Sequence, residues 1–97
     1  MANLMTNLEE RCVKALRLST SAGTLLLTEI QNNIEAARAE LIRAGVSEEK
    51  VQEEGSLVQQ AIIDYVLMEM NTEDQYDRYL NAFQYQMDNL RKSFPKE

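Results

Sequence analysis

Histidine and tryptophan are absent from this 97-residue chain, and cysteine occurs only once, at Cys12. Without histidine and with one thiol, a single chain cannot build the usual nucleophile–base pairs or soft-metal sites. We therefore predict a protein that is not an enzyme and that holds no metal and no cofactor. The lone Cys12 cannot form an internal disulfide, which fits a reducing compartment, and it is expected to be a small core residue.

Glycine and proline are also scarce, with three and one residues, so few tight turns are available for an all-β fold. Leu, Ala, Glu, Gln, Met and Arg are frequent, and these residues favour helices. We predict an all-α protein with one domain over residues 1–97, of which 1–5 are expected to be disordered. No basic-then-apolar leader is visible, so secretion is not expected.

Positive charge is in short supply, since the net charge is −6. Affinity for nucleic acid comes largely from Lys and Arg that neutralise phosphates, so unaided or sequence-specific nucleic-acid binding is not expected. Residues 1–22 carry three basic and two acidic groups, whereas 23–54 carry three basic and seven acidic groups. The adjacent carboxylates, such as Glu48 and Glu49, are interpreted as solvated or helix-capping charge.

The stretch from 57 to 70 is the most apolar part of the chain, and it is predicted to be the central helix of a small bundle. At about 100° per residue it has one apolar face around Val58 and Ile62 and a second apolar face on the other side. A helix that is apolar on two sides needs cover on two sides. It is too short to span a membrane, which takes about 20 apolar residues. The second face gives our candidates for a subunit interface: Ile63, Val66, Leu67 and Met70.

Three other helices follow from periodicity and capping signals. Thr6 and Glu9 form a capping-box pattern at the start of the first helix, and Thr72 and Gln75 form another before the last. The Ser/Thr-rich segment 19–24 is predicted to break the chain, Gly45 to end the second helix and Ser56 to cap the central one. The predicted helices span about 7–18, 24–44, 56–70 and 73–93, with an irregular connector at 45–55 anchored by Val46 and Val51.

The four tyrosines are interpreted mainly as core or core-edge residues. Tyr65 and Tyr76 fall on apolar stripes, whereas Tyr79 and Tyr85 lie beside the stripe of the last helix. The second pair could therefore also face a partner.

In the order of its segments, the chain resembles the phage head–tail connector (adaptor) family, also labelled phage DNA-packaging proteins. The resemblance covers roughly residues 8–92 and depends on four successive pieces. These are VKALRL at 13–18 before a Ser/Thr-rich break, IEAARAEL at 34–41 leading into AGV at 44–46, an acidic connector, and LVQQAIIDYV at 57–66.

The resemblance implies a structural role without catalysis. Such proteins are small helical domains that form a ring, twelve-fold in the virion, on the portal of a filled phage head. The ring extends the DNA channel and docks a tail or stopper protein. The expected locations are the virion neck and, during assembly, the host cytoplasm, with no membrane partner. From charge and expected exposure, the candidates for the portal contact are Arg11, Lys14, Arg17, Arg91, Lys92 and Phe94.

Two other functions remain open from the sequence. A small DNA-binding regulator of the helix-turn-helix type would need a basic recognition helix, and none of the predicted helices is basic. A small helical adaptor or antitoxin-like partner is the second alternative, and an all-α chain that lacks catalytic side chains is compatible with it.

Overall fold

The computed structural model describes residues 5–71 and 74–96, which fold into helices joined by short connections. In chain order the helices are α1 (Asn7–Ala15), α2 (Thr20–Leu25), α3 (Leu27–Arg43), α4 (Glu48–Glu53), α5 (Ser56–Met70) and α6 (Tyr76–Ser93). The described residues contain no β-strand, apart from one isolated bridge between Val46 and Pro95. The all-α prediction is confirmed, but the chain has two short helices beyond the four that we predicted.

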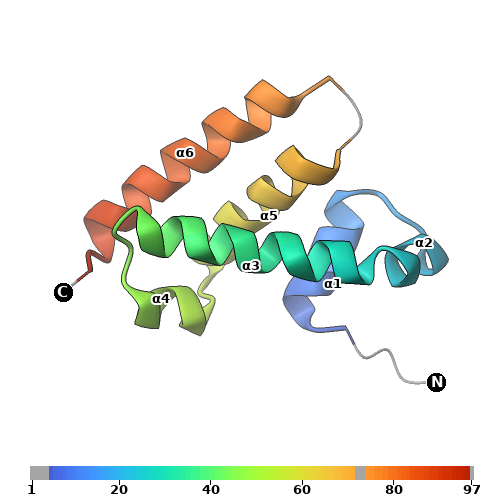
Figure 1. The fold of residues 1–97 in the computed structure, drawn as a ribbon, viewed down its shortest axis with the longest axis horizontal. Coiled ribbons are helices and arrows are strands. Elements are labelled where there is room, and N and C mark those ends of the chain that lie inside the picture. The colour runs from blue at the N-terminus through green and yellow to red at the C-terminus, as the bar shows by residue number, and fades with distance from the viewer. Residues whose placement is uncertain (1–4, 72–73, 97) are drawn as a thin grey trace.

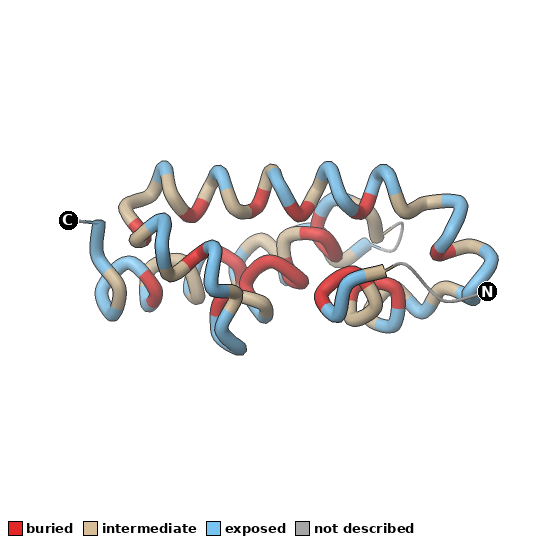
Figure 2. The backbone as a smooth tube through the Cα atoms, turned by 90° about the horizontal axis from the view of Figure 1, so that it is seen from below, coloured by how far each residue is buried: buried red, intermediate tan, exposed pale blue. Residues whose placement is uncertain are grey.

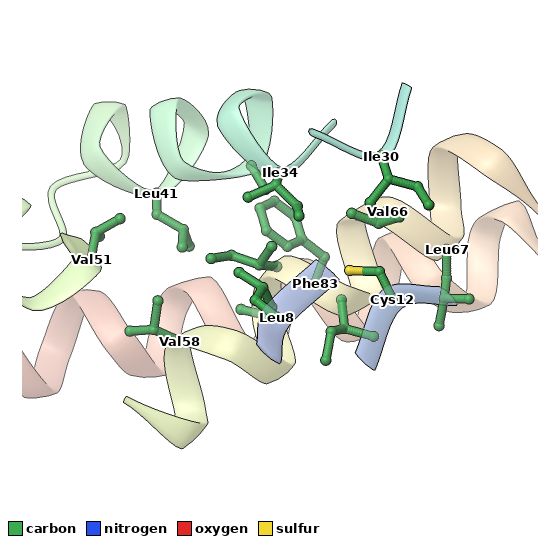
Figure 3. Packing of buried hydrophobic residues seen from close by; sticks show 14 of the residues in the cluster. Leu8, Cys12, Ile30, Ile34, Leu41, Val51, Val58, Val66, Leu67 and Phe83 are labelled. Carbon is green, nitrogen blue, oxygen red and sulfur yellow. The ribbon is translucent and has the colours of Figure 1, made fainter. Parts of the chain in front are cut away.

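Helix α5 lies at the centre of the fold, because α1, α3 and α6 all pack against it. Figure 1 shows α6 running back alongside α5 as an antiparallel hairpin, while α3 crosses the molecule on its long axis. In Figure 2 the buried positions of α3 lie on the side that faces the other helices. The core therefore fills the space between α3 and the helices beneath it, and Figure 3 shows side chains of α1, α3 and α5 meeting there with Phe83.

Helix α1 begins as predicted and ends early. The Thr6 side chain accepts a hydrogen bond from the Glu9 backbone N–H, and the Glu9 carboxylate accepts one from the Thr6 N–H. At the other end Arg17 has a φ of 58°, and the Leu18 N–H bonds back to the Val13 carbonyl. This left-handed turn is a common way to end a helix, although glycine usually occupies that position. The predicted end at residue 18 was therefore wrong by three residues.

The segment predicted as a break forms the short helix α2 instead. The Ser19 side chain accepts a hydrogen bond from the Ala22 backbone N–H and so caps it. Gly23 lies within this helix, and the closeness of α1 explains why the residue is a glycine. A Cβ atom at position 23 would be 2.9 Å from Cγ1 of Val13. The turn-prone composition of the segment thus reflects a helix cap and a tight helix–helix contact. Helix α3 consequently starts at Leu27, three residues later than predicted.

We expect Gly23→Ala to destabilise the protein despite alanine's better helix propensity. The propensity gain is about 1 kcal/mol, whereas overpacking a well-filled site costs about 1–3 kcal/mol, and the branched Val13 side chain has little freedom to move. A net loss of about 1 kcal/mol in the free energy of unfolding should appear in urea titrations. Gly55→Ser is the control, because a Cβ there meets nothing within 4 Å, serine is accepted at the N-cap of α5, and its stability should stay near that of the parent. Equal stability of the two variants would contradict the close α1–α2 contact.

The connection from α3 to α5 was predicted to be irregular over residues 45–55, but Glu48–Glu53 form helix α4 within it. Gly45 has a φ of 107° just after α3, as expected for a glycine that ends a helix. Val46 and Val51 are fully buried and anchor the connector, as predicted. Ser47 caps the short helix α4. The cap of α5 is different from the prediction, since Gly55 takes the N-cap position and Ser56 is already helical.

Helix α6 starts at Tyr76 and has Gln75 as its N-cap, without a side-chain capping bond. The predicted capping residue Thr72 and the predicted first helical residue 73 lie outside the described residues. At its other end the chain returns to the α3–α4 connection. The Ser47 N–H donates to the Phe94 carbonyl and the Lys96 N–H donates to the Gly45 carbonyl, each at 2.8 Å. These two bonds hold the end of α6 against the α3–α4 connection.

Candidate interaction surface

The residues predicted to form a subunit interface lie inside the core of the single chain. Ile63, Val66 and Leu67 are only 5%, 0% and 8% exposed, and Met70 is partly buried against the same cluster. The prediction that this face of α5 is free for a neighbouring subunit was therefore wrong. In this fold the chain supplies its own cover for both faces of α5.

Both apolar faces of α5 are covered because three other helices of the chain pack against it. Helices α3, α6 and α1 surround α5, so a side chain on almost any side of it meets a neighbour. Figure 3 shows Val66 and Leu67 on α5 in the same cluster as Cys12 from α1 and Ile30 from α3. Two apolar faces in a sequence demand cover, but periodicity alone does not say whether the cover is internal or comes from another subunit.

The predicted portal-contact residues separate into two ends of the molecule. Lys14 and Arg17 are exposed near the α1–α2 turn, whereas Arg91 and Lys92 are exposed in the last turn of α6. Figure 1 places these two regions at opposite ends of the long axis. Both α6 cations pair with Asp88, and Lys92 Nζ lies 3.0 Å from its carboxylate. The structure does not bring the six candidates together as one patch.

The other two candidates, Arg11 and Phe94, are half-buried and have partners inside the chain. Arg11 donates a hydrogen bond from its guanidinium to the side-chain oxygen of Gln59, which joins α1 to α5. The centroid of the Phe94 ring lies 5.5 Å from the Lys50 ammonium. This cation–π contact joins α4 to the residue that follows α6. Both residues hold the fold together in addition to any outward role.

Large apolar side chains are exposed at several points that the sequence did not single out. Leu25 is 84% exposed and Leu57 is 65% exposed. Leu25 begins a run of three leucines, and a helix cannot direct three consecutive side chains into one core. Tyr76 and Tyr85 are 51% and 71% exposed, so the core or core-edge prediction was wrong for both. Tyr65 does pack inward, edge-on against Phe83.

A buried carboxylate on α5 is the second feature that sequence reasoning missed. Asp64 is 7% exposed and hydrogen-bonds with the side chains of Gln86 and Gln60. Loss of solvent raises the pKa of Asp64 above its ordinary value of 3.8, although both hydrogen bonds oppose the rise. The sequence does contain a signal for this burial. Asp64 is a single acidic residue within an apolar stretch that includes Ile63 and Val66, and a helix that is apolar on two sides leaves few positions exposed.

We expect Asp64→Asn to stabilise the folded protein at neutral pH. A raised pKa in the folded state means that the unfolded chain releases the proton first, so stability falls as pH rises from 3.8 through the higher folded value. Asparagine carries no charge and adds an N–H donor for Gln86 Oε1, which has no hydrogen-bond partner within the described structure. The measurement is urea unfolding of both proteins at several pH values.

The stability difference between Asp64→Asn and the parent should shrink as the pH approaches 3.8. Glu69→Gln serves as the control, since it makes the same carboxylate-to-amide change at an exposed position of the same helix and should have a small effect. A parent that loses stability on acidification faster than Asp64→Asn would contradict the assigned direction of the pKa.

Reactive and ligand-binding groups are few in the described part of the chain. Burial raises the pKa of the fully buried Cys12 thiol to about 11, so it stays protonated at neutral pH. Within residues 5–71 and 74–96, no three or more acidic, histidine or cysteine side chains gather in a way that could hold a metal ion. The same part of the chain has no helix of the length and apolar character needed to cross a bilayer.

What the surface offers is therefore a set of exposed apolar and charged side chains on a helical scaffold. Comparison with family models, curated proteins and solved structures gives no match to the chain.

Proposed function

We propose that the chain is a non-catalytic structural subunit of the neck of a tailed phage. In this proposal copies of the chain form a ring on the portal, extend the DNA channel and dock a tail or stopper protein. The observation that carries the proposal is the presence of two strongly exposed leucines on different helices of a packed domain, Leu25 at the end of α2 and Leu57 in the first turn of α5. A closed ring needs two different surfaces on every subunit, one for each neighbour.

Charge supports the same role. The net charge is −6, so a ring of these subunits would repel the DNA in its channel and let it slide. The resemblance in residues 13–18, 34–46 and 57–66 adds support from the sequence. The exposed cations Arg91 and Lys92 at the end of α6 remain our candidates for the portal side.

The proposal is tested by mixing the purified chain with the purified portal protein from the same genome. Electron microscopy should show an additional ring stacked on one face of the portal. The variant Arg91→Glu with Lys92→Glu should weaken stacking, while the matched variant Gln84→Glu with Asn89→Glu, exposed on the same helix, should retain it. A portal that remains bare with the unmodified chain at high excess would overturn the proposal. A salt-dependent shift of duplex DNA by the chain would favour a DNA-binding regulator instead.

A further inference from the structure

We infer that copies of this chain join head to tail, with the α1–α2 end of one copy on the α4–α5 groove of the next. The α1–α2 end is defined by Lys14, Arg17 and Leu25. The α4–α5 groove is the hollow lined by Lys50, Glu53, Leu57, Val58 and Phe94. The inference rests on the proposed ring. It names two surfaces that would form the ring in place of the second face of α5, which is buried in the core of the single chain.

The groove has an apolar floor and the size of a side-chain pocket. Leu57 is exposed at its edge, Val58 is buried beneath it, and the Phe94 ring lies under the Lys50 ammonium. Its volume is about 220 Å³. Small-molecule sites are typically about 300–1,000 Å³, so this hollow suits one protruding side chain better than a cofactor.

Leu25 is the side chain best placed to fill such a hollow. At 84% it is the most exposed of the large apolar residues in the described structure, while the following Leu26 is half-buried. Leu25 is the last residue of α2, and Figure 1 places α2 at one end of the long axis. A single exposed leucine is ordinary on a protein surface, so the choice of occupant depends on the charges around it.

The charges at the two surfaces are complementary. Between residues 14 and 28 the chain has Lys14 and Arg17 and no acidic residue, whereas residues 48–54 have four glutamates and one lysine. Lys50, that one cation, is 3.4 Å from the Glu53 carboxylate, and Glu54 pairs with Arg38 of α3. Glu48 and Glu49 are therefore the exposed glutamates of this segment that make no ion pair within the described residues. Arg91, Lys92 and Lys96 also lie toward this end, where Arg91 and Lys92 share Asp88 as a partner, so the acidic character belongs to the α4 side of the groove. A basic α1–α2 end with a protruding leucine therefore matches an apolar groove with an acidic α4 side, and a second copy of the chain carries both.

The positions of the surfaces determine the kind of assembly. The α1–α2 end and the α4–α5 groove lie toward opposite ends of a molecule about 42 Å long. Leu25 of one copy therefore cannot reach the groove of the same copy. Contacts between two different surfaces are heterologous, and their repetition gives a ring or an open filament. A twofold dimer would instead bring the same surface of each copy together.

Cysteine cross-linking distinguishes these arrangements. One copy carries Leu25→Cys and a second, size-tagged copy carries Leu57→Cys, and both retain Cys12, which has no exposed area. A short bifunctional maleimide added to the concentrated mixture should give mixed dimers in several-fold excess over either variant alone. The parent with only Cys12 is the control for background. Dimers of Leu25→Cys alone in equal yield, or no dimers in the mixture, would overturn the inference.

Charge reversal provides a second readout that does not depend on one side chain. Adding Lys14→Glu and Arg17→Glu to the Leu25→Cys copy should abolish the mixed cross-link, because the acidic groove then faces an acidic end. Adding Glu49→Lys and Glu53→Lys to the Leu57→Cys copy should restore it. Circular dichroism checks that each variant is folded. Failure of the second reversal to restore the cross-link in folded protein would argue against direct pairing of these surfaces.

Repeating the cross-link with portal present separates this inference from the proposed function. Mixed dimers without a stacked ring would overturn the connector function and leave the head-to-tail contact standing. A stacked ring in which Leu25→Cys and Leu57→Cys do not cross-link would overturn the head-to-tail contact alone.

Discussion

Ile63→Asp is expected to unfold the free chain. Ile63 is 5% exposed on α5, so the change removes a buried side chain at about 2–5 kcal/mol and leaves an unpaired carboxylate that costs about 3–5 kcal/mol more. The total stability of a domain is only about 5–15 kcal/mol, so the folded state should no longer dominate. Leu67→Asp, at 8% exposure, should behave in the same way. Far-ultraviolet circular dichroism should show loss of most helical signal at ambient temperature.

Leu57→Asp is the matched control for Ile63→Asp. It places the same carboxylate on the same helix, but at a position that is 65% exposed. Its helical signal and melting transition should stay close to those of the parent. If Ile63→Asp remained folded and merely lost self-association, the second face of α5 would be an intersubunit surface, contrary to the structure.

Phe83→Ala should produce the largest loss of stability among simple truncations. Phe83 is 3% exposed at the centre of the core, and removing a buried phenylalanine costs about 3–5 kcal/mol. It also removes the edge-on contact with Tyr65, whose ring centroid is 5.1 Å away. Such aromatic pairs contribute about 0.5–1.5 kcal/mol beyond the area that they bury. The midpoint of urea unfolding should fall sharply, and Phe83→Leu should recover part of the loss.

Tyr85→Ala tests whether the loss at Phe83 is specific to the core. Position 85 lies two residues further along α6 and its side chain is 71% exposed. Truncation there should change stability by no more than about 0.5 kcal/mol. A comparable loss at both positions would mean that α6 packs with a different face than the structure shows.

The long helices could be predicted because their signals are local. The stripe through Ile30, Ile34 and Leu41 faces the core as its spacing indicates, and Thr6 and Gly45 mark helix ends by side-chain capping and backbone freedom. Helix α2 could not be predicted in this way. Its Gly23 argues for a break when considered alone and becomes intelligible only through its contact with Val13.

The candidate surface was harder to predict than the helices, for a physical reason. Sequence periodicity shows that both faces of α5 must avoid water, but the identity of the neighbour is a tertiary fact. For Val66 that neighbour is the chain itself. Conversely, Leu25 looked like one more apolar residue in a leucine run, and only the turn into α3 shows that it points outward.

The hydrogen bonds that join residues 45–47 to residues 94–96 have a practical consequence for experiments. They place residues 94–96 next to the start of α4. A fluorophore attached at the exposed position 96 would lie on that flank, toward the other end of the molecule from α2. Energy transfer from such a label to a dye on position 25 of another molecule would thus report encounters between unlike ends, while a bulky group at the same point would obstruct them.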